Sequence, residues 1–327
     1  MKRMLFKIPL YMVLLLAGHM LVNQVITPMP VPDLARVRAV ADRAPDLLFF
    51  GDSTNKWIDA ADQDQRSIDQ FLSEALPSVT TGVIQHEAFH LGAYADVVDY
   101  LADRKALPDV LILPINPRSF SPMWYRKPAW QFEVFSYAMA AGTERRFNLW
   151  VRPLGVFKAL RLRKVSAAEF GKTPVYDGSK VIGRVSDIND YRRHIAADGT
   201  FSSKYKKQYL SYIYLYELTA DHPLLKDLHR CLRRTRDAGS RVVAYLPPID
   251  IETAVEWYGE DIRPRIRANL AVIKEIVKSY GVNVRDLTFA LSSEHFTWNP
   301  VPNEHLKDVG RRYVAAQIAD ALRRSAR

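Results

Sequence analysis

The fold of this chain is decided by the stretch Leu47-Leu-Phe-Phe-Gly-Asp-Ser-Thr-Asn-Lys-Trp57. Its four leading apolar residues, with Asp46 before them, predict a strand at 46–50 that is buried on both faces, as in a parallel sheet. Gly51 allows a tight turn, and the polar residues after it suit the start of a helix. Such a strand–turn–helix unit presents Ser53 at the carboxyl end of its strand, where α/β proteins place their active sites.

Other apolar runs predict the rest of the sheet. They cover residues 109–114, 241–246 and, more weakly, 282–284, with a further candidate at 78–85 that Gly82 interrupts. Apolar residues at helical spacing predict intervening helices at 65–75, 94–104, 268–280 and 309–323. Strands that alternate with helices form parallel βαβ units. We therefore expect an α/β fold, a three-layer α/β/α sandwich with a mostly parallel five-stranded sheet.

The rest of the chain predicts a modular organisation. An N-terminal segment covers residues 1–26, a linker and lead-in covers 27–45, and the α/β domain covers 46–120 and 228–327. The intervening stretch, 121–227, is basic and rich in Trp and Tyr, and a structureless loop of that length is uncommon. We expect it to be a helical cap insertion, with amphipathic helices at 147–165 and 204–218.

The N-terminal segment has the pattern of a membrane-entering sequence. Lys2, Arg3 and Lys7 precede a mostly apolar run at 8–22, and positive charge before such a run keeps the N-terminus cytoplasmic. The run is shorter than the ~20 residues that span a bilayer comfortably, but no small-x-small cleavage site follows it. We expect a single-pass anchor in the inner membrane with the domain in the periplasm. The alternative is a secreted or periplasmic protein after signal cleavage.

Composition and charge narrow the classes of partner. The chain has 327 residues, of which 48% are hydrophobic and 25% are charged, as in ordinary globular proteins. A net charge of +10 suits an anionic partner such as a lipid headgroup or an acidic polysaccharide. No helix-turn-helix, zinc-finger or RNP pattern is present, so no nucleic-acid partner is expected. Part of the charge lies in a basic tail: Arg311, Arg312, Arg323, Arg324 and Arg327.

Ser53 and His305 are the candidate catalytic pair. A serine hydroxyl becomes a nucleophile when a turn exposes it and a neighbouring base removes its proton. The alternative for Asp52-Ser53 is a helix N-cap only. His305 lies in Asn303-Glu-His-Leu-Lys-Asp-Val-Gly310, directly before an apolar-periodic helix. In a doubly wound sheet this loop lies at the same edge as Ser53, where the imidazole is in place to act as the base.

Four short motifs in this order resemble the sequence blocks of the SGNH (GDSL-like) hydrolases. Residues 47–53 resemble block I, Gly92 in a helical segment resembles block II, Asn116 after a strand resembles block III, and Glu304-His305-Leu306 with Gly310 resembles block V. The resemblance covers 46–120 and 240–323. It implies a flavodoxin-like, SGNH-type sandwich that uses no cofactor, in which Ser53 attacks an ester carbonyl and His305 serves as base and then acid.

The resemblance also assigns an oxyanion site. Its donors are the backbone N–H groups of Ser53 and Gly92 and the side-chain amide of Asn116, which donates while staying uncharged.

One departure from the family concerns the acid that orients the histidine. The position three residues before His305, where the family carries an aspartate, is Pro302. The nearest candidates for the orienting group are Asn303 or Glu304, and Asp286 is a more distant one.

The resemblance implies acyl-ester chemistry in the cell envelope. We expect a serine esterase or acyltransferase that acts on acyl esters, acetyl foremost, of an acylated polysaccharide or lipid-linked glycan. Similar chains with an N-terminal anchor often work beside a multi-pass membrane O-acyltransferase, which is the expected protein partner. The alternative is a catalytically weak or inactive scaffold that binds glycan in the same pocket and partners such an enzyme.

A competing motif is His86-Glu-Ala-Phe-His90, which matches the H-E-x-x-H pattern of zinc peptidases. On a helix, His86 and His90 would bind zinc and Glu87 would be the base. The residues before it are β-branched and strand-like, and no third-ligand pattern follows. We expect a strand-to-helix junction and no metal, with a zinc metallopeptidase as the alternative. A solvated acidic turn, rather than a divalent-ion site, is expected for three carboxylates: Asp59, Asp62 and Asp64.

Overall fold

The computed structural model describes residues 9–18, 32–121, 124, 132–141, 176–177, 180–181, 201–298 and 300–325. The chain divides into two compact units. The smaller unit comprises residues 1–36 and 133–163, and the larger comprises 37–132 and 164–327. The larger unit holds the central sheet and every residue of the candidate site.

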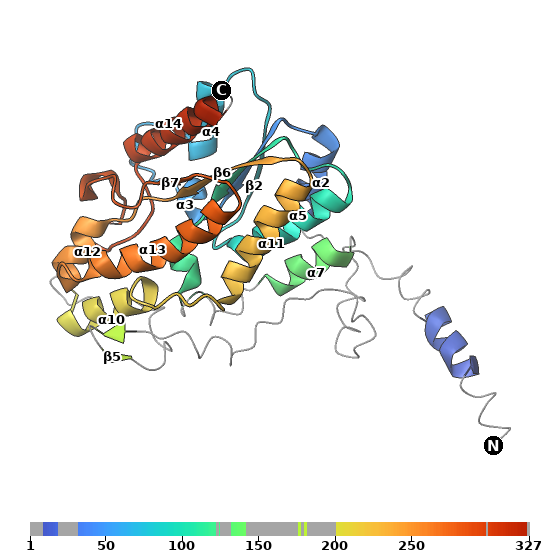
Figure 1. Cartoon of the computed structure of the whole chain (residues 1–327), viewed down its shortest axis with the longest axis horizontal. Helices are drawn as coiled ribbons and strands as arrows, with labels where there is room; N and C mark the ends of the chain where they lie inside the picture. The colour runs from blue at the N-terminus through green and yellow to red at the C-terminus, as the bar shows by residue number, and fades with distance from the viewer. Residues whose placement is uncertain are drawn as a thin grey trace. The chain divides into compact units, whose positions relative to one another are not determined.

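Five parallel strands form the centre of the larger unit (Figure 1). They are β1 (Leu47–Gly51), β2 (Thr81–Gln85), β3 (Val110–Pro114), β6 (Arg241–Leu246) and β7 (Val284–Asp286). Their order is β2-β1-β3-β6-β7, and each neighbouring pair is parallel. The strands β1, β2, β3 and β6 fall on apolar runs that the sequence singled out, to within one residue, whereas β7 shares only Val284 with the weak run predicted at 282–284. The predicted α/β fold with a five-stranded sheet is confirmed, and the sheet is parallel throughout.

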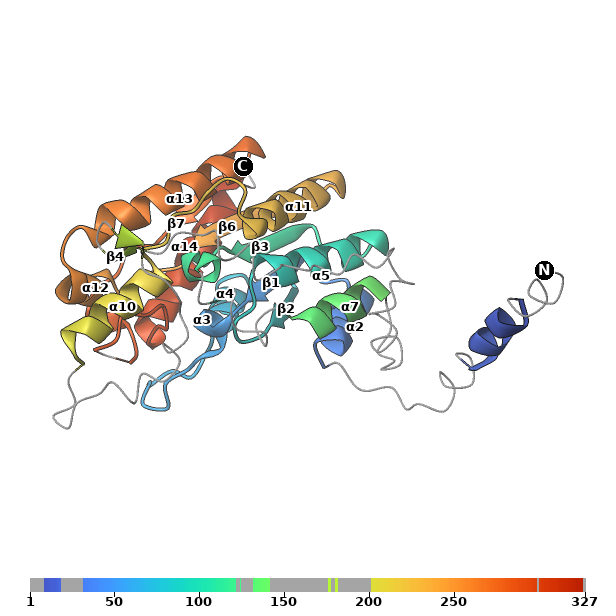
Figure 2. The ribbon, with the colours of Figure 1, turned by 90° about the horizontal axis from the view of Figure 1, so that it is seen from below.

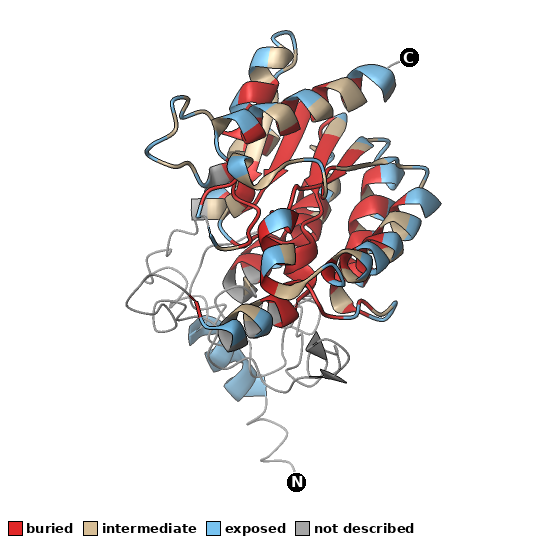
Figure 3. Cartoon of the chain, turned by 90° about the vertical axis from the view of Figure 1, so that its left-hand side faces the viewer, coloured by how far each residue is buried: buried red, intermediate tan, exposed pale blue. Residues whose placement is uncertain are grey.

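Helices cover both faces of this sheet (Figures 1 and 2). Helices α4 (Ile68–Ala75) and α14 (Asp308–Ser325) pack together on one face, whereas α5 (Leu91–Asp103) and α11 (Pro223–Asp237) pack together on the other. Side chains alternate along a strand, so Leu47 and Phe49 face the α4–α14 layer while Phe50 stacks on Tyr94 of α5. Figure 3 shows the buried strands between the two layers.

Several helices differ from the predicted boundaries. The segment predicted as a linker contains α2 (Pro32–Arg43), and α12 (Ile251–Tyr258) was not predicted. Helix α11 begins before residue 228, so the predicted end of the insertion falls inside a helix. Helices α10 (Ser203–Ile213) and α13 (Ile262–Ser279) overlap the helices predicted at 204–218 and 268–280, while the helix predicted at 147–165 lies outside the described residues.

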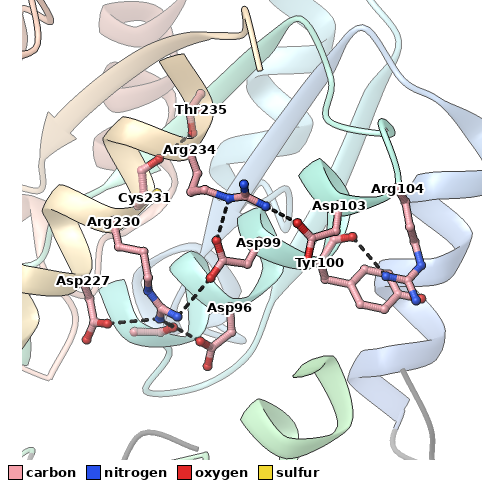
Figure 4. Close-up of polar contacts among 11 residues, drawn as sticks. Asp96, Asp99, Tyr100, Asp103, Arg104, Asp227, Arg230, Cys231, Arg234 and Thr235 are labelled. Atoms are coloured by element: carbon pink, nitrogen blue, oxygen red, sulfur yellow. Dashed lines mark hydrogen bonds and ion pairs between the residues drawn. The ribbon is translucent and has the colours of Figure 1, made fainter. Parts of the chain in front are cut away.

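Helix α11 is held on α5 by ion pairs (Figure 4). Arg230 lies 2.7 Å from Asp96 and 3.1 Å from Asp99, and Arg234 lies 2.9 Å from Asp99 and also pairs with Asp103. The three carboxylates recur at intervals of three or four residues, which places them on one side of α5. This contact explains how a helix as polar as α11 packs in the second layer.

The predicted membrane anchor lies mainly outside the described residues. The described part, 9–18, is helical, and its apolar side chains from Leu10 to Leu16 are 51–64% exposed. Within the described ranges, no helix has both the length and the apolar character that a membrane span requires. The anchor therefore stays a prediction.

Candidate active site

Ser53 and His305 meet at the carboxyl edge of the sheet although 252 positions separate them in the sequence. Ser53 begins the short helix α3 (Ser53–Lys56) directly after β1, and His305 lies in the loop before α14. The distance from His305 Nε2 to Ser53 Oγ is 3.1 Å. A base at this distance is within hydrogen-bond reach of the proton that it would remove. The structure thus brings the two residues together, and their catalytic roles stay predictions.

The turn that presents Ser53 depends on Gly51 and Asp52. A Cβ at Gly51 would lie 3.0 Å from Gln85 Cβ and 3.2 Å from Asn55 Cβ, so β1 can approach its neighbours closely only with glycine here. Asp52 caps α3 by accepting the Thr54 N–H at 2.8 Å. The N-cap interpretation therefore holds for Asp52, and it leaves the Ser53 hydroxyl to His305.

Asn303 organises the loop that carries His305. Its side-chain amide donates to the carbonyls of Thr297 and Val301, each at 2.7 Å, and its Oδ1 accepts the His305 backbone N–H at 2.7 Å. The Thr297 N–H in turn donates to the His305 carbonyl at 2.9 Å. Asn303 thus fixes the backbone of the loop, and the predicted contact with the imidazole is absent.

Glu304 also does not orient the imidazole. It is buried, forms an ion pair with Arg118 at 2.9 Å and accepts the hydroxyl hydrogen of Tyr214. Consecutive side chains in extended backbone point to opposite sides, so Glu304 faces away when His305 faces Ser53. The third candidate, Asp286, pairs with Lys274 instead.

The second ring nitrogen of His305 lacks a hydrogen-bonding acid. Among the residues that the structure describes, none hydrogen-bonds to its Nδ1. The imidazole instead packs against two tryptophans. Its centroid lies 4.0 Å from that of Trp298 and 6.0 Å from that of Trp57. The imidazole is therefore packed by aromatic rings and, within the described residues, lacks the carboxylate that bonds to Nδ1 in a Ser-His-Asp triad.

The surroundings of His305 keep its imidazole neutral. Burial lowers the pKa of His305 well below its ordinary value, and the nearby cation of Arg118 lowers it further. Burial raises the pKa of Glu304, while Arg118 and the Tyr214 hydroxyl oppose that shift. A neutral imidazole is the form that can accept the serine proton.

Two of the three predicted oxyanion donors already have partners. The Gly92 N–H donates to Nδ1 of His90 at 3.1 Å, which caps α5, so the predicted role of Gly92 is not met in this arrangement. The Asn116 amide donates to the Asp52 carboxylate at 3.1 Å. An NH₂ group has two hydrogens, so Asn116 can donate a second bond. The remaining candidates for oxyanion donors are the second amide hydrogen of Asn116 and the Ser53 N–H.

The H-E-x-x-H match does not form a zinc site. His86 follows β2, and His90 is the N-cap of α5, so the two histidines do not share a helical face. The predicted strand-to-helix junction is what the structure shows. No group of three or more metal-binding side chains occurs within the described part of the chain.

The acidic turn after α3 is ion-paired rather than solvated. Asp62 lies 2.6 Å from the fully buried Arg311, and Asp64 lies 2.6 Å from Arg66. The hydrogen bond from Arg66 lowers the pKa of Asp64 to about 2. Arg311 is consequently buried, unlike its neighbour Arg312 in the same basic tail, whose side chain is 58% exposed.

Comparison with known proteins adds little. No protein-family model matches the chain, and no curated protein matches it. One similar solved structure is "a possible lipase from Chitinophaga pinensis DSM 2588". It is 13% identical with a TM-score of 0.40, and the match covers 86% of this chain and 99% of the other. So distant a likeness says nothing about the activity of this chain.

Proposed function

We propose that this chain is a serine-dependent ester hydrolase or acyltransferase. The observation that carries the proposal is the 3.1 Å contact between Ser53 Oγ and His305 Nε2. Burial and the cation of Arg118 lower the pKa of His305, so the imidazole is in the neutral form that a general base requires, and the same shift makes it a weaker proton acceptor.

The chemistry follows from these groups. Ser53 Oγ attacks the ester carbonyl carbon while His305 Nε2 takes the hydroxyl proton, and the carbonyl oxygen becomes an oxyanion. In this proposal the Ser53 N–H and the Asn116 amide donate to that oxygen. His305 then gives its proton to the departing alcohol, which leaves an acyl-serine. Water or an acceptor alcohol attacks the acyl-serine by the reverse steps, with His305 again acting as base. Because no carboxylate among the described residues hydrogen-bonds to the imidazole, a modest rate is expected.

The substrate and the location are parts of the same proposal. We infer an acylated glycan of the cell envelope as substrate and a multi-pass O-acyltransferase as partner. The net charge of +10 supports an anionic surface or polymer nearby. The exposed apolar helix at 9–18, preceded in the sequence by Lys2, Arg3 and Lys7, supports a membrane anchor.

Ester hydrolysis by the purified full chain tests the proposal. The wild type should release p-nitrophenol from a short-chain p-nitrophenyl ester, and Ser53→Ala or His305→Ala should lower kcat/KM at least about 100-fold. Ser73→Ala, a partly buried serine on α4, is the matched control and should retain activity. Equal rates of ester hydrolysis by the wild type and by Ser53→Ala would contradict the proposed serine-dependent activity.

A second candidate function is a non-catalytic glycan-binding scaffold. Two observations favour it, namely that no residue in the described ranges hydrogen-bonds to Nδ1 of His305 and that the Gly92 N–H is used in a helix cap. A scaffold should retain glycan after Ser53→Ala and His305→Ala and should not react with a fluorophosphonate probe. Covalent labelling of Ser53 would reject the scaffold.

A further inference from the structure

Two tryptophans beside the candidate pair are exposed. Trp57 and Trp298 are 41% and 43% exposed, and their rings meet edge to face at 4.9 Å. Outside the helix at 9–18, the only other large hydrophobic side chain exposed within the described ranges is Val309. Two of these three side chains thus lie next to Ser53 and His305. An apolar surface concentrated at such a place indicates a binding site.

Each tryptophan is fixed to one member of the catalytic pair. The backbone N–H of Trp57 donates to the Ser53 carbonyl at 2.8 Å, so Trp57 lies one helical turn after Ser53 along the chain. Trp298 shares the His305 loop, and its ring lies against the imidazole. Both tryptophans are therefore at defined positions relative to the reacting atoms.

The backbone at Trp298 supports a functional role. Its φ is +60°, a conformation that is uncommon for a bulky residue. Asn303 holds this turn by donating to the carbonyls of Thr297 and Val301 on either side of it. A strained residue persists only where the surrounding structure maintains it, and such residues cluster at ligand-binding sites.

We propose that Trp57 and Trp298 form a subsite for the sugar ring that carries the ester, an inference that rests on the proposed function. A pyranose has an apolar face, which suits a half-exposed aromatic ring, and hydroxyl groups at its edge, which stay in water. A long acyl chain would instead require apolar burial on all sides.

The subsite would select for the alcohol part of the ester. The centroid of the Trp57 ring lies 6.0 Å from that of the His305 imidazole, so a sugar ring stacked on Trp57 would lie beside the catalytic pair. The subsite should therefore raise kcat/KM for an acetylated sugar and leave kcat/KM unchanged for a small acetyl ester that has no sugar ring.

The ratio of two kcat/KM values measures this contribution. The full chain is assayed with methyl 6-O-acetyl-glucopyranoside and with ethyl acetate, and the ratio of the first value to the second is the selectivity. Trp57→Ala should lower the selectivity about 10-fold, and Trp57→Phe should restore part of it. Tyr280→Ala, which removes an aromatic ring at the opposite edge of the sheet, should leave the ratio at the wild-type value.

Two readouts separate failure of the subsite from failure of the proposed function. If fluorophosphonate labels Ser53 but Trp57→Ala has wild-type selectivity, the subsite is wrong and the esterase stands. If the wild type is neither labelled nor active on either ester, the proposed function is wrong. Tryptophan fluorescence during titration with the acetylated glucoside then decides the subsite. A change in fluorescence that occurs in the wild type and is lost in Trp57→Ala supports the subsite. Absence of any fluorescence change in the wild type overturns the subsite.

Discussion

At the scale of single residues, the protonation state of His305 follows from its surroundings. Burial penalises the imidazolium, and the cation of Arg118 repels it, so both lower the pKa of His305. The base is active only when neutral. A lowered pKa extends the neutral form, and with it the activity, to pH values below the ordinary histidine range near 6.5.

In a pH profile of kcat/KM, the midpoint of the acid limb should therefore lie below pH 6.5. Replacing both members of the buried ion pair, as Arg118→Met with Glu304→Gln, removes the repelling cation without leaving an unpaired charge. The limb should then move to higher pH while staying below 6.5, because burial is the larger cause. Glu304→Gln alone keeps the cation and should not move the limb upward. A pH profile of the double variant identical to that of the wild type would refute this electrostatic role.

Asn303 should matter for stability and for activity. Asn303→Leu removes two donors and one acceptor that satisfy buried backbone groups of the His305 loop. We expect urea unfolding to show a loss of about 2–4 kcal/mol and kcat to fall, because the imidazole loses its fixed position. Asn303→Asp keeps the bond to the His305 N–H and should retain more kcat. If Asn303→Leu lost neither stability nor activity, the Asn303 hydrogen bonds would not be what holds the His305 loop.

At the scale of elements, one buried side chain joins the two segments that carry the site. Arg311 on α14 donates to the carbonyls of Arg66 at 2.8 Å, Asp64 at 2.7 Å and Leu306 at 2.8 Å, besides its ion pair with Asp62. It therefore ties the segment after α3 to the end of the His305 loop. Arg311 has no exposed surface, and the N–H groups of this buried cation donate to three carbonyls and one carboxylate.

Arg311→Met should destabilise the fold by about 3–5 kcal/mol, because it leaves a buried carboxylate and three carbonyls without their donor. The neighbouring Arg312 is the matched control. Its side chain is 58% exposed and pairs only with Asp64 among the ion pairs of the described residues. Arg312→Met should leave the unfolding midpoint nearly unchanged. Thermal or urea unfolding makes the comparison, and equal midpoints for the two variants would contradict the proposed role of Arg311.

The elements that the sequence predicted best are the buried strands. β1 and β6 are short apolar runs between turn signals, and burial on both faces leaves them no other place in a soluble fold. Helix α11 was missed because its surface is largely charged, and its packing depends on partners more than 130 positions away, as between Arg230 and Asp96. Local patterns do not contain such partners.

At the scale of the whole molecule, the topology brings the two ends of the larger unit together. β1 lies between β2 and β3, and the later strands extend the sheet in one direction from β3. Because all strands are parallel, the segments that follow them emerge at one edge. Ser53 follows β1 and His305 follows β7, and this arrangement explains why the motif order in the sequence predicted their contact.

The other contacts of the site could be predicted only in part. The direction of Glu304, away from the imidazole and toward Arg118, follows from alternation along the backbone once His305 is placed, so that signal was present. Its pairing with Arg118, 186 positions away, had no local signal, although Arg118 does lie just past the end of a predicted strand. The tryptophan contacts with His305 depend on the turn at Trp298, whose φ of +60° no propensity predicts.

Fluorophosphonate labelling of the full chain, followed by peptide mapping, tests most directly whether Ser53 is an activated nucleophile. We predict one labelled peptide, which contains Ser53, and at least about a 100-fold slower labelling in His305→Ala because the hydroxyl then lacks its base. Absence of label on the wild type, label on a different serine, or labelling of His305→Ala at the wild-type rate would contradict the proposed catalytic pair.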